Sequence, residues 1–290
     1  MSRPSLITIV QRAGRGGLFG RGDLVLCACS GGPDSTALLH ALAIARRKIG
    51  HRLVAVGVDH GLRTEARAEL AIAADVALAQ RVPFEMATVA VEPGANLQAR
   101  AREARHRALQ AQAQLLGAKV IALGHTADDR AETVVMRLLR GAGPRGLAVM
   151  PARSAGIAFD PVDGFVPVDL VRPLIAARRS DVAAHLERHR LASASDPSNT
   201  DRRFLRARVR SEVMPLLEAL SPQVVAHLCA LADQIDPGPD DPLAGLPRAQ
   251  RAALGRALAA RRSGTLIRLG GGYDLALRFL RHDEGGEPPR

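Results

Sequence analysis

The sequence is poor in aromatic residues and in lysine. Its 290 residues include six phenylalanines, one tyrosine and no tryptophan, so a core has to be built from aliphatic side chains and a ring platform for stacking bases would be thin. Lys48 and Lys119 are the only lysines, and arginine therefore carries most of a formal net charge of +11. A biased composition explains arginine in place of lysine, but not the excess of basic over acidic residues. The charge favours a polyanionic partner, because the planar guanidinium suits phosphate.

Cysteine is scarce as well, and long apolar runs are missing. The three cysteines form no CxxC motif and no disulfide framework, and Cys27 and Cys29 share one face of an apolar strand. The apolar residues 6–10 are too few for a signal peptide, and no stretch could span a bilayer. We expect a cytoplasmic protein without membrane association. Apolar residues make up 47% of the chain, which is enough to bury a core.

The first half of the chain alternates short apolar runs with helical patterns. This alternation predicts a doubly wound α/β domain over residues 1–175, with a parallel sheet covered on both faces. Ligands of such folds lie beyond the carboxyl ends of the strands. The predicted strands are 24–29, 53–58, 84–89 and 119–123. The predicted helices are 34–48, 64–81, 96–116 and 127–140.

The second half predicts helices alone, at 178–189, 203–217, 223–234 and 248–262. Residues 236–243 have the composition of a linker, and residues 265–280 could form a short hairpin. We therefore expect a smaller all-helical domain over 176–262, followed by a short hairpin and tail over 263–290.

The strand 24–29 runs directly into a glycine-rich loop that predicts a phosphate site. Its residues are Ser30, Gly31, Gly32, Pro33, Asp34 and Ser35. The glycines allow close backbone approach, proline suits the first helical position, and the serines add hydroxyl donors. Asp34 beside a phosphate implies a bridging Mg²⁺. An ordinary strand-to-helix turn is the alternative, and SGG alone would favour it, but SGGxDS in this context favours function.

The SGGxDS element resembles the signature of the PP-loop ATP pyrophosphatases. The resemblance implies an adenine nucleotide alpha hydrolase-like fold, ATP and Mg²⁺ as cofactors, and cleavage of ATP that releases pyrophosphate and leaves an adenylated oxygen. Within this superfamily, the segment Val58–Arg63, which reads VDHGLR, resembles an element of the lysidine synthetase family. There His60 would help to hold the adenosine. A polar turn capped by Gly61 is the alternative.

Two helical segments extend this resemblance. The first carries Arg102 and Arg105 on one helix face, and Arg105 is a candidate to neutralise charge at the reacting phosphate. A solvated basic face is an equally good interpretation, and His106 stands where the family usually has tyrosine. The second is GHTADDRAET over residues 124–133, which is close to the family segment.

The segment 124–133 is where the resemblance implies most of the chemistry. Gly124 would belong to the nucleotide site, Asp129 and Glu132 would hold the ammonium of free L-lysine, and His125 would sit at the reacting centre. We expect His125 to handle protons, because the normal pKa of histidine is near working pH. The alternative for Asp129 is a capping box with Thr126.

The family pattern continues through Asn199 into an arginine-rich run. Arg203, Arg206 and Arg210 share one face of a predicted helix, and they are candidates for tRNA phosphate contacts. Arg206 is also a candidate for transition-state stabilisation, whereas Ala207 replaces the usual asparagine. The region 176–262 is therefore expected to bind tRNA.

Taken together, the resemblance implies an ATP-dependent ligase. It would join lysine to C2 of the wobble cytidine of tRNA(Ile) with a CAU anticodon, through an adenylated cytidine, and would switch codon reading from AUG to AUA. A homodimer is compatible with the sequence. Three alternatives remain: a tRNA thiolase, although Cys27 and Cys29 are misplaced for it; a synthetase using glutamine, which would need an amidotransferase domain; and a non-catalytic tRNA-binding protein, which the intact loop argues against.

Overall fold

The computed structural model describes residues 4–59, 61, 65–91, 94, 97–156, 167–194, 203–235, 254, 256, 266–270 and 273–276. Most of the chain up to residue 235 is therefore in view. The predicted linker 236–243 lies outside the described residues, as does all but two residues of the predicted helix 248–262.

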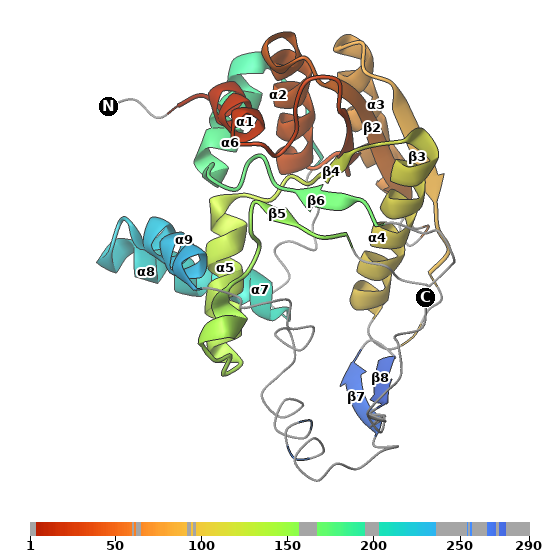
Figure 1. Ribbon diagram of the computed structural model, residues 1–290. Coiled ribbons are helices and arrows are strands. Elements are labelled where there is room, and N and C mark those ends of the chain that lie inside the picture. Colours follow the sequence, from red (N-terminus) through yellow and green to blue (C-terminus); the bar gives the residue numbers. More distant parts are fainter. Residues whose placement is uncertain are drawn as a thin grey trace, which may run out of the picture.

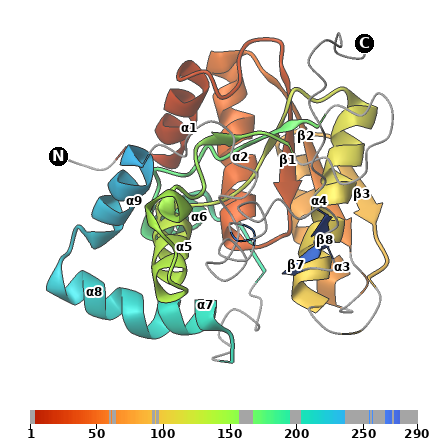
Figure 2. The same ribbon diagram turned by 60° about the horizontal axis from the view of Figure 1, so that its bottom comes forward.

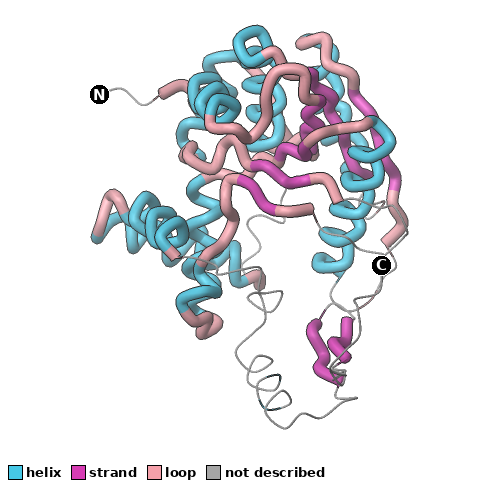
Figure 3. Tube along the Cα trace, viewed as in Figure 1, coloured by secondary structure: helices cyan, strands magenta, loops and turns pink. Residues whose placement is uncertain are grey.

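The centre of the molecule is a six-stranded sheet in the order β3-β2-β1-β4-β6-β5 (Figures 1 and 3). Every pairing in it is parallel except that of β5 with β6. This confirms the predicted doubly wound, largely parallel sheet. The strands are β1 (Leu24–Cys29), β2 (Arg52–Asp59), β3 (Phe84–Thr88), β4 (Val120–Ala122), β5 (Arg153–Ser154) and β6 (Asp169–Val171).

Four of these strands follow the predicted ones closely, whereas β5 and β6 were missed. The missed strands have only two and three residues. Segments this short show no alternation or apolar run long enough to stand out from a loop. Their place at the edge of the sheet comes from pairing with β4 and with each other.

Two apolar layers bury the faces of the sheet. One layer contains side chains of α1 (Leu6–Arg15), α2 (Pro33–Ile49), α3 (Glu65–Ala79) and α6 (Arg179–His189). The other packs α4 (Leu97–Leu116) against Leu26, Val56 and Ile121. Each strand of the centre therefore has both of its faces covered, which explains why these strands read as continuous apolar runs.

Helix α1 was not predicted, although its signal is readable. Ser5 caps the helix by accepting a hydrogen bond from the Thr8 N–H. Leu6, Ile9 and Val10 then recur at helical spacing and are buried in the first apolar layer. The length of the run 6–10 argues against a signal peptide, but its spacing also has the period of a helix.

A group of helices lies beside the sheet around α5 (Ala127–Leu139). It consists of α7 (Leu205–Arg208), α8 (Met214–Leu220) and α9 (Val224–Gln234). Figure 2 shows α7, α8 and α9 next to α5, and apolar side chains of α8, α9 and the turn before α8 form a cluster with those of α5. The predicted helix 203–217 thus exists, but it begins at Leu205 and is interrupted.

The interruption is a π-helical turn over Val209–Val213. Pro215 follows it at the start of α8. Proline has no N–H to donate to the carbonyl four residues earlier, so an ordinary α-helix cannot run through this point without losing a hydrogen bond.

The last described element is the hairpin of β7 (Leu266–Gly270) and β8 (Tyr273–Ala276), whose antiparallel pairing confirms the predicted hairpin. The predicted domain boundary after residue 175 stays a prediction, and α6, which follows it, packs within the first apolar layer. Among the described residues no single helix is long and apolar enough to cross a membrane; the pair 205–220 and 224–234 passes by length and composition only when joined across a 98° bend.

Candidate active site

The candidate site lies at the carboxyl ends of the neighbouring strands β1 and β4, after which the chain continues toward opposite edges of the sheet. From β1 the chain crosses toward β2 and β3, whereas from β4 it crosses toward β6. Such a switch point leaves a crevice beyond the carboxyl ends of the strands, where ligands bind in open α/β sheets. The loop after β1 contains Asp34 and the loop after β4 contains Gly124. They touch, because a Cβ added at Gly124 would lie 3.0 Å from the backbone of Asp34.

The loop after β1 has the backbone shape of an anion site. Gly31 has φ +79°, and a Cβ there would lie 1.9 Å from the carbonyl oxygen of Glu69, so only glycine fits. Gly32 is the N-cap of α2 and makes no side-chain capping bond, and Pro33 occupies the first turn. The helix therefore points its first N–H groups and its positive end at the crevice.

The two serines of the loop have different surroundings, and their predicted role as hydroxyl donors stays a prediction. Ser35 is buried, its hydroxyl donates to the carbonyl of Gly32 at 3.0 Å, and its oxygen accepts from the Ser30 N–H at 3.2 Å. Ser35 therefore holds the shape of the loop from inside. Ser30 is exposed, with its oxygen 3.3 Å from that of Ser35.

Asp34 is the acidic group of the loop. Its Oδ1 is buried and has no hydrogen-bond partner among the described residues. Burial and the charge of Asp129 together raise the pKa of Asp34 to about 6, against the opposing effect of Arg179 and Arg210. A buried oxygen without a partner is costly unless something absent from the protein chain satisfies it. A hard cation such as Mg²⁺, which prefers carboxylate oxygens, fits this position.

Helix α5 begins with the capping box that was considered for Asp129. Asp129 Oδ2 accepts from the N–H and the hydroxyl of Thr126, and the Asp129 N–H donates back to the threonine oxygen. The capping interpretation is thereby confirmed. It uses only one carboxylate oxygen, however, and Asp129 Oδ1 points elsewhere.

That second oxygen and the carboxylate of Glu132 meet three guanidinium groups. Asp129 Oδ1 lies 2.9 Å from Arg206 Nη2 and 3.2 Å from Arg179 Nη2. Glu132 is 1% exposed and contacts all three arginines: Arg179 at 3.1 Å, Arg206 at 3.2 Å and Arg210 at 2.8 Å. The predicted lysine carboxylates and two of the predicted tRNA arginines therefore form one network with Arg179, in which both carboxylates already have cationic partners.

Arg206 and Arg210 do share a helix face, as predicted, but that face is turned toward the carboxylates of α5. Arg203 is exposed and precedes the helix. Arg178 and Arg179 at the start of α6 were not predicted as site residues. Arg178 donates to both oxygens of Asp128 and to Glu218, so it fastens the start of α6 to α5 and α8. No motif marks these arginines, whose contacts span about fifty positions of the chain.

His125 lies in the loop between β4 and α5, and its Nδ1 is buried with no partner in the described part of the chain. Burial lowers the pKa of His125 to about 3; Asp129 opposes the shift, and Arg172, Arg102 and Arg206 add to it. The imidazole is therefore neutral near pH 7. The expectation that the pKa of His125 lies near working pH is wrong for this structure, because burial and the neighbouring arginines disfavour the charged imidazolium.

The remaining predicted residues surround this centre. Partial desolvation and the nearby cations Arg105 and Arg206 lower the pKa of Arg102, so this exposed part of α4 lies near Arg206. The two interpretations of this face, charge neutralisation at the reacting phosphate by Arg105 and a solvated basic surface, both stay predictions. His60 lies outside the described residues, and so does the segment around Asn199. Asp59, at the end of β2, accepts from the Gly61 N–H at 2.9 Å, as the polar-turn alternative expects.

Comparison with known proteins gives consistent results. The PP-loop domain family matches residues 18–217. The chain is 45% identical over 213 residues to the tRNA(Ile)-lysidine synthase of Salinispora tropica, covering 72% of this chain and 61% of that protein. It is 37% identical over 283 residues to that of Thermobifida fusca, covering 88% and 83%. It is 41% identical over 206 residues to that of Pseudomonas aeruginosa, covering 71% and only 44%.

Among solved structures, the U34-tRNA thiolase NcsA from Methanococcus maripaludis is similar with a TM-score of 0.63. The match covers 80% of each chain at 18% identity. A likeness at this identity concerns the fold, and it agrees with the doubly wound sheet described above.

Proposed function

The chain belongs to the tRNA(Ile)-lysidine synthase family of PP-loop proteins, and from this membership we propose that it ligates free L-lysine to C2 of the wobble cytidine of a CAU-anticodon tRNA(Ile) at the expense of ATP. Its relatives are named tRNA(Ile)-lysidine synthases, but the chain spans less than two thirds of the length of some of them. The observation that carries the proposal is the convergence at one switch point of three features: a glycine-rich loop, an Asp34 oxygen with no partner among the described residues, and the carboxylates of α5.

The first step would use the loop after β1. The triphosphate of ATP would lie on Ser30–Ser35, above the N-terminus of α2, with Gly124 leaving space at the side. Asp34 would hold Mg²⁺, which supplies positive charge to the phosphates when it is bound. The C2 carbonyl oxygen of the cytidine attacks the α-phosphate and pyrophosphate leaves. Arg105 and Arg206 would offset the charge that develops there.

The second step needs the lysine amine beside the adenylated base. The ammonium would bind Asp129 and Glu132, its amine form attacks C2, and AMP leaves with the oxygen. Both carboxylates already contact guanidinium groups, so the ammonium can bind only after an arginine has turned away. Arg206 and Arg210 are 38% and 31% exposed, which allows their side chains to move to RNA phosphates. We therefore expect tRNA to bind before lysine.

His125 would act in this step as a neutral imidazole. A pKa of about 3 makes it a poor base for an ammonium group, whose ordinary pKa is about 10.4. Its unpartnered Nδ1 can instead accept a hydrogen bond and so orient the amine.

The tRNA would be recognised mainly by charge and shape. The target cytidine has to leave the anticodon stack to reach the crevice. With 2% aromatic residues, the protein would hold the flipped base and the backbone chiefly through arginine, including the exposed Arg203. The helical region 176–262 would supply most of these contacts. We place the reaction in the cytoplasm, and a homodimer stays a prediction.

A thiolase is less well supported. Cys27 and Cys29 are both buried inside β1, with their sulfur atoms 3.7 Å apart, whereas Cys229 lies on α9. The hydrogen bond from the Cys29 thiol and burial raise the pKa of the Cys27 thiol, which opposes formation of a thiolate for sulfur chemistry.

The decisive experiment measures labelled lysine in tRNA. The full chain is incubated with ATP, Mg²⁺ and radiolabelled lysine, together with tRNA(Ile) bearing CAU or with a matched tRNA bearing another anticodon. We expect incorporation only into the CAU tRNA, and pyrophosphate release that depends on this tRNA but not on lysine. Equal labelling of both tRNAs, or labelling with other amino acids, would overturn the proposal.

A further inference from the structure

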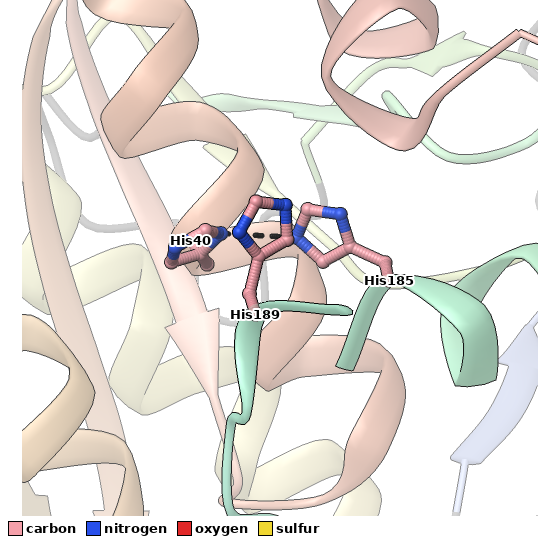
Figure 4. A group of neighbouring side chains, drawn as sticks. All are labelled: His40, His185 and His189. Atoms are coloured by element: carbon pink, nitrogen blue, oxygen red, sulfur yellow. Dashed lines mark hydrogen bonds between the residues drawn. The ribbon is translucent and has the colours of Figure 1, made fainter. Parts of the chain in front are cut away.

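Three histidines gather on the side of the sheet opposite α4, outside the site described above. His40 comes from α2, and His185 and His189 come from α6 (Figure 4). His40 and His185 are each 5% exposed, and His189 is partly exposed. Neither the catalytic steps nor the family motifs involve any of them. Three imidazoles in one place within an otherwise aliphatic layer call for an explanation.

The positions of the nitrogen atoms suit a metal ion. One ring nitrogen from each histidine lies within 4.8 Å of the others, and His40 Nδ1 is 3.0 Å from His185 Nε2. In a tetrahedral zinc site with Zn–N bonds of about 2.0–2.1 Å, ligand atoms are about 3.3 Å apart. The pair His40–His185 already has nearly this spacing. The His189 ring lies beside both, with its centroid 4.6 Å and 4.5 Å from theirs, and its ligand nitrogen has to approach from within 4.8 Å to complete the site.

The chemistry of the ligands agrees with the geometry. His185 and His189 are four residues apart on one helix face, which is the spacing of the histidine pairs in helical zinc sites. Burial lowers the pKa of His40 and of His185 to about 4, with contributions from the neighbouring histidines and, for His185, Arg188. Both are therefore neutral at pH 7, which is the form that binds metal.

We propose that His40, His185 and His189 bind one Zn²⁺ ion, with water as the fourth ligand, and that the ion fastens α6 to α2. Imidazole nitrogen is a preferred zinc ligand, and a site with three protein ligands leaves one position for solvent. The partly exposed His189 provides the route by which the ion enters. The role is structural: α2 begins at the phosphate loop and α6 begins at Arg179, so the ion joins the two helices that bring these groups to the crevice.

The proposal is tested on the full chain after treatment with a chelator. Co²⁺ is added as a spectroscopic probe, its visible absorption is followed, and Zn²⁺ is then added to displace it. We expect one Co²⁺ per chain, an intense tetrahedral spectrum and displacement by an equal amount of Zn²⁺. Zinc at 100 times its Kd should raise the melting temperature by roughly 5 °C.

Variants identify the ligands. His189→Ala should weaken binding by more than about 100-fold, which exceeds the usual effect of a residue that only supports a ligand. The matched control is His227→Ala, which removes an exposed histidine on α9. His189 is not fully buried, so its variant should fold, and far-UV circular dichroism without metal checks this. His40→Asn is the second test.

Two results would overturn the proposal. One is equal Co²⁺ affinity of His189→Ala and His227→Ala, or the absence of stoichiometric binding, which would leave the three rings as neutral packed side chains. The other is a sulfur-to-cobalt charge-transfer band that disappears in Cys229→Ser, which would assign the ion to a thiolate instead.

Discussion

Glu132 is the group whose loss should be felt most strongly in both stability and function. The change Glu132→Gln keeps the shape of the side chain and replaces one carboxylate oxygen by an amide NH₂. Glu132 makes four contacts with guanidinium nitrogens, two at each oxygen. The amide can accept the two bonds of one oxygen, but its NH₂ faces donors at the other, so two charge-assisted hydrogen bonds are lost.

The magnitude follows from these contacts. A hydrogen bond to a charged group contributes about 1.5–3 kcal/mol, and the lower value applies here because the three arginines are about one-third exposed to solvent. Two lost bonds therefore cost about 3 kcal/mol. The matched control is Glu218→Gln, since Glu218 is 37% exposed and Arg178 keeps its bonds to Asp128. Its cost should stay below about 1 kcal/mol.

The assay is urea unfolding followed by far-UV circular dichroism, because a chain without tryptophan gives little fluorescence signal. A double-mutant cycle with Arg210→Met should give a coupling energy of about 1.5–3 kcal/mol. In the enzyme assay, Glu132→Gln should lose lysine incorporation while tRNA-dependent pyrophosphate release falls much less. Equal destabilisation by Glu132→Gln and Glu218→Gln, or a coupling near zero, would refute the account of the network.

Three other changes probe separate parts of the molecule. Gly31→Ala places a methyl group against the Glu69 carbonyl and should lower ATP affinity by more than about tenfold, whereas Gly17→Ala, which has the same positive φ but no atom within 4 Å, should not. Asp34→Ala should abolish pyrophosphate release and leave tRNA affinity within about twofold in a filter-binding assay, since the loop is proposed to bind ATP. Burial lowers the folded-state pKa of His51 to about 4. The neutral ring therefore makes its full contribution to the free energy of unfolding above the unfolded-state pKa of about 6.5, and this contribution is lost as the pH falls toward 4. His51→Gln should therefore reduce the loss of unfolding free energy between pH 7 and pH 4 by up to about 3 kcal/mol, and an unchanged pH profile would contradict this.

The parts of the site that the sequence predicts are those built by local backbone chemistry. The loop from Ser30 to Ser35 is an example, because glycine, proline and a helix N-terminus determine its shape within six residues. The capping box of Thr126 and Asp129 is another, since both partners lie in one turn. Strands β1, β2 and β4 belong to the same class, because nearly continuous burial leaves an apolar run in each, whereas β3 at the edge is only partly covered.

What the sequence did not predict depends on packing between distant segments. Arg206 and Arg210 were expected to face RNA, but Val209 and Met214 pack with α5 in one apolar cluster, and the two arginines contact Glu132 instead. Arg179 joins them from α6, a partnership across 47 residues that no motif encodes. The pKa of His125 likewise depends on burial and on cations from several elements, none of which is adjacent in the chain.

The π-helical turn over Val209–Val213 has a consequence for the helical phase of the segment around it. Val209 and Met214 are five residues apart, a separation that places side chains about 140° apart in a regular α-helix. Both are nevertheless buried in the same apolar cluster with α5. The extra residue in the turn resets the phase, so the segment can keep Arg206 and Arg210 on the carboxylates and still send Met214 into the cluster. Deletion of one residue within the turn would make these two requirements compete, and a one-residue change in length would there decide whether the arginines or the apolar side chains keep their partners.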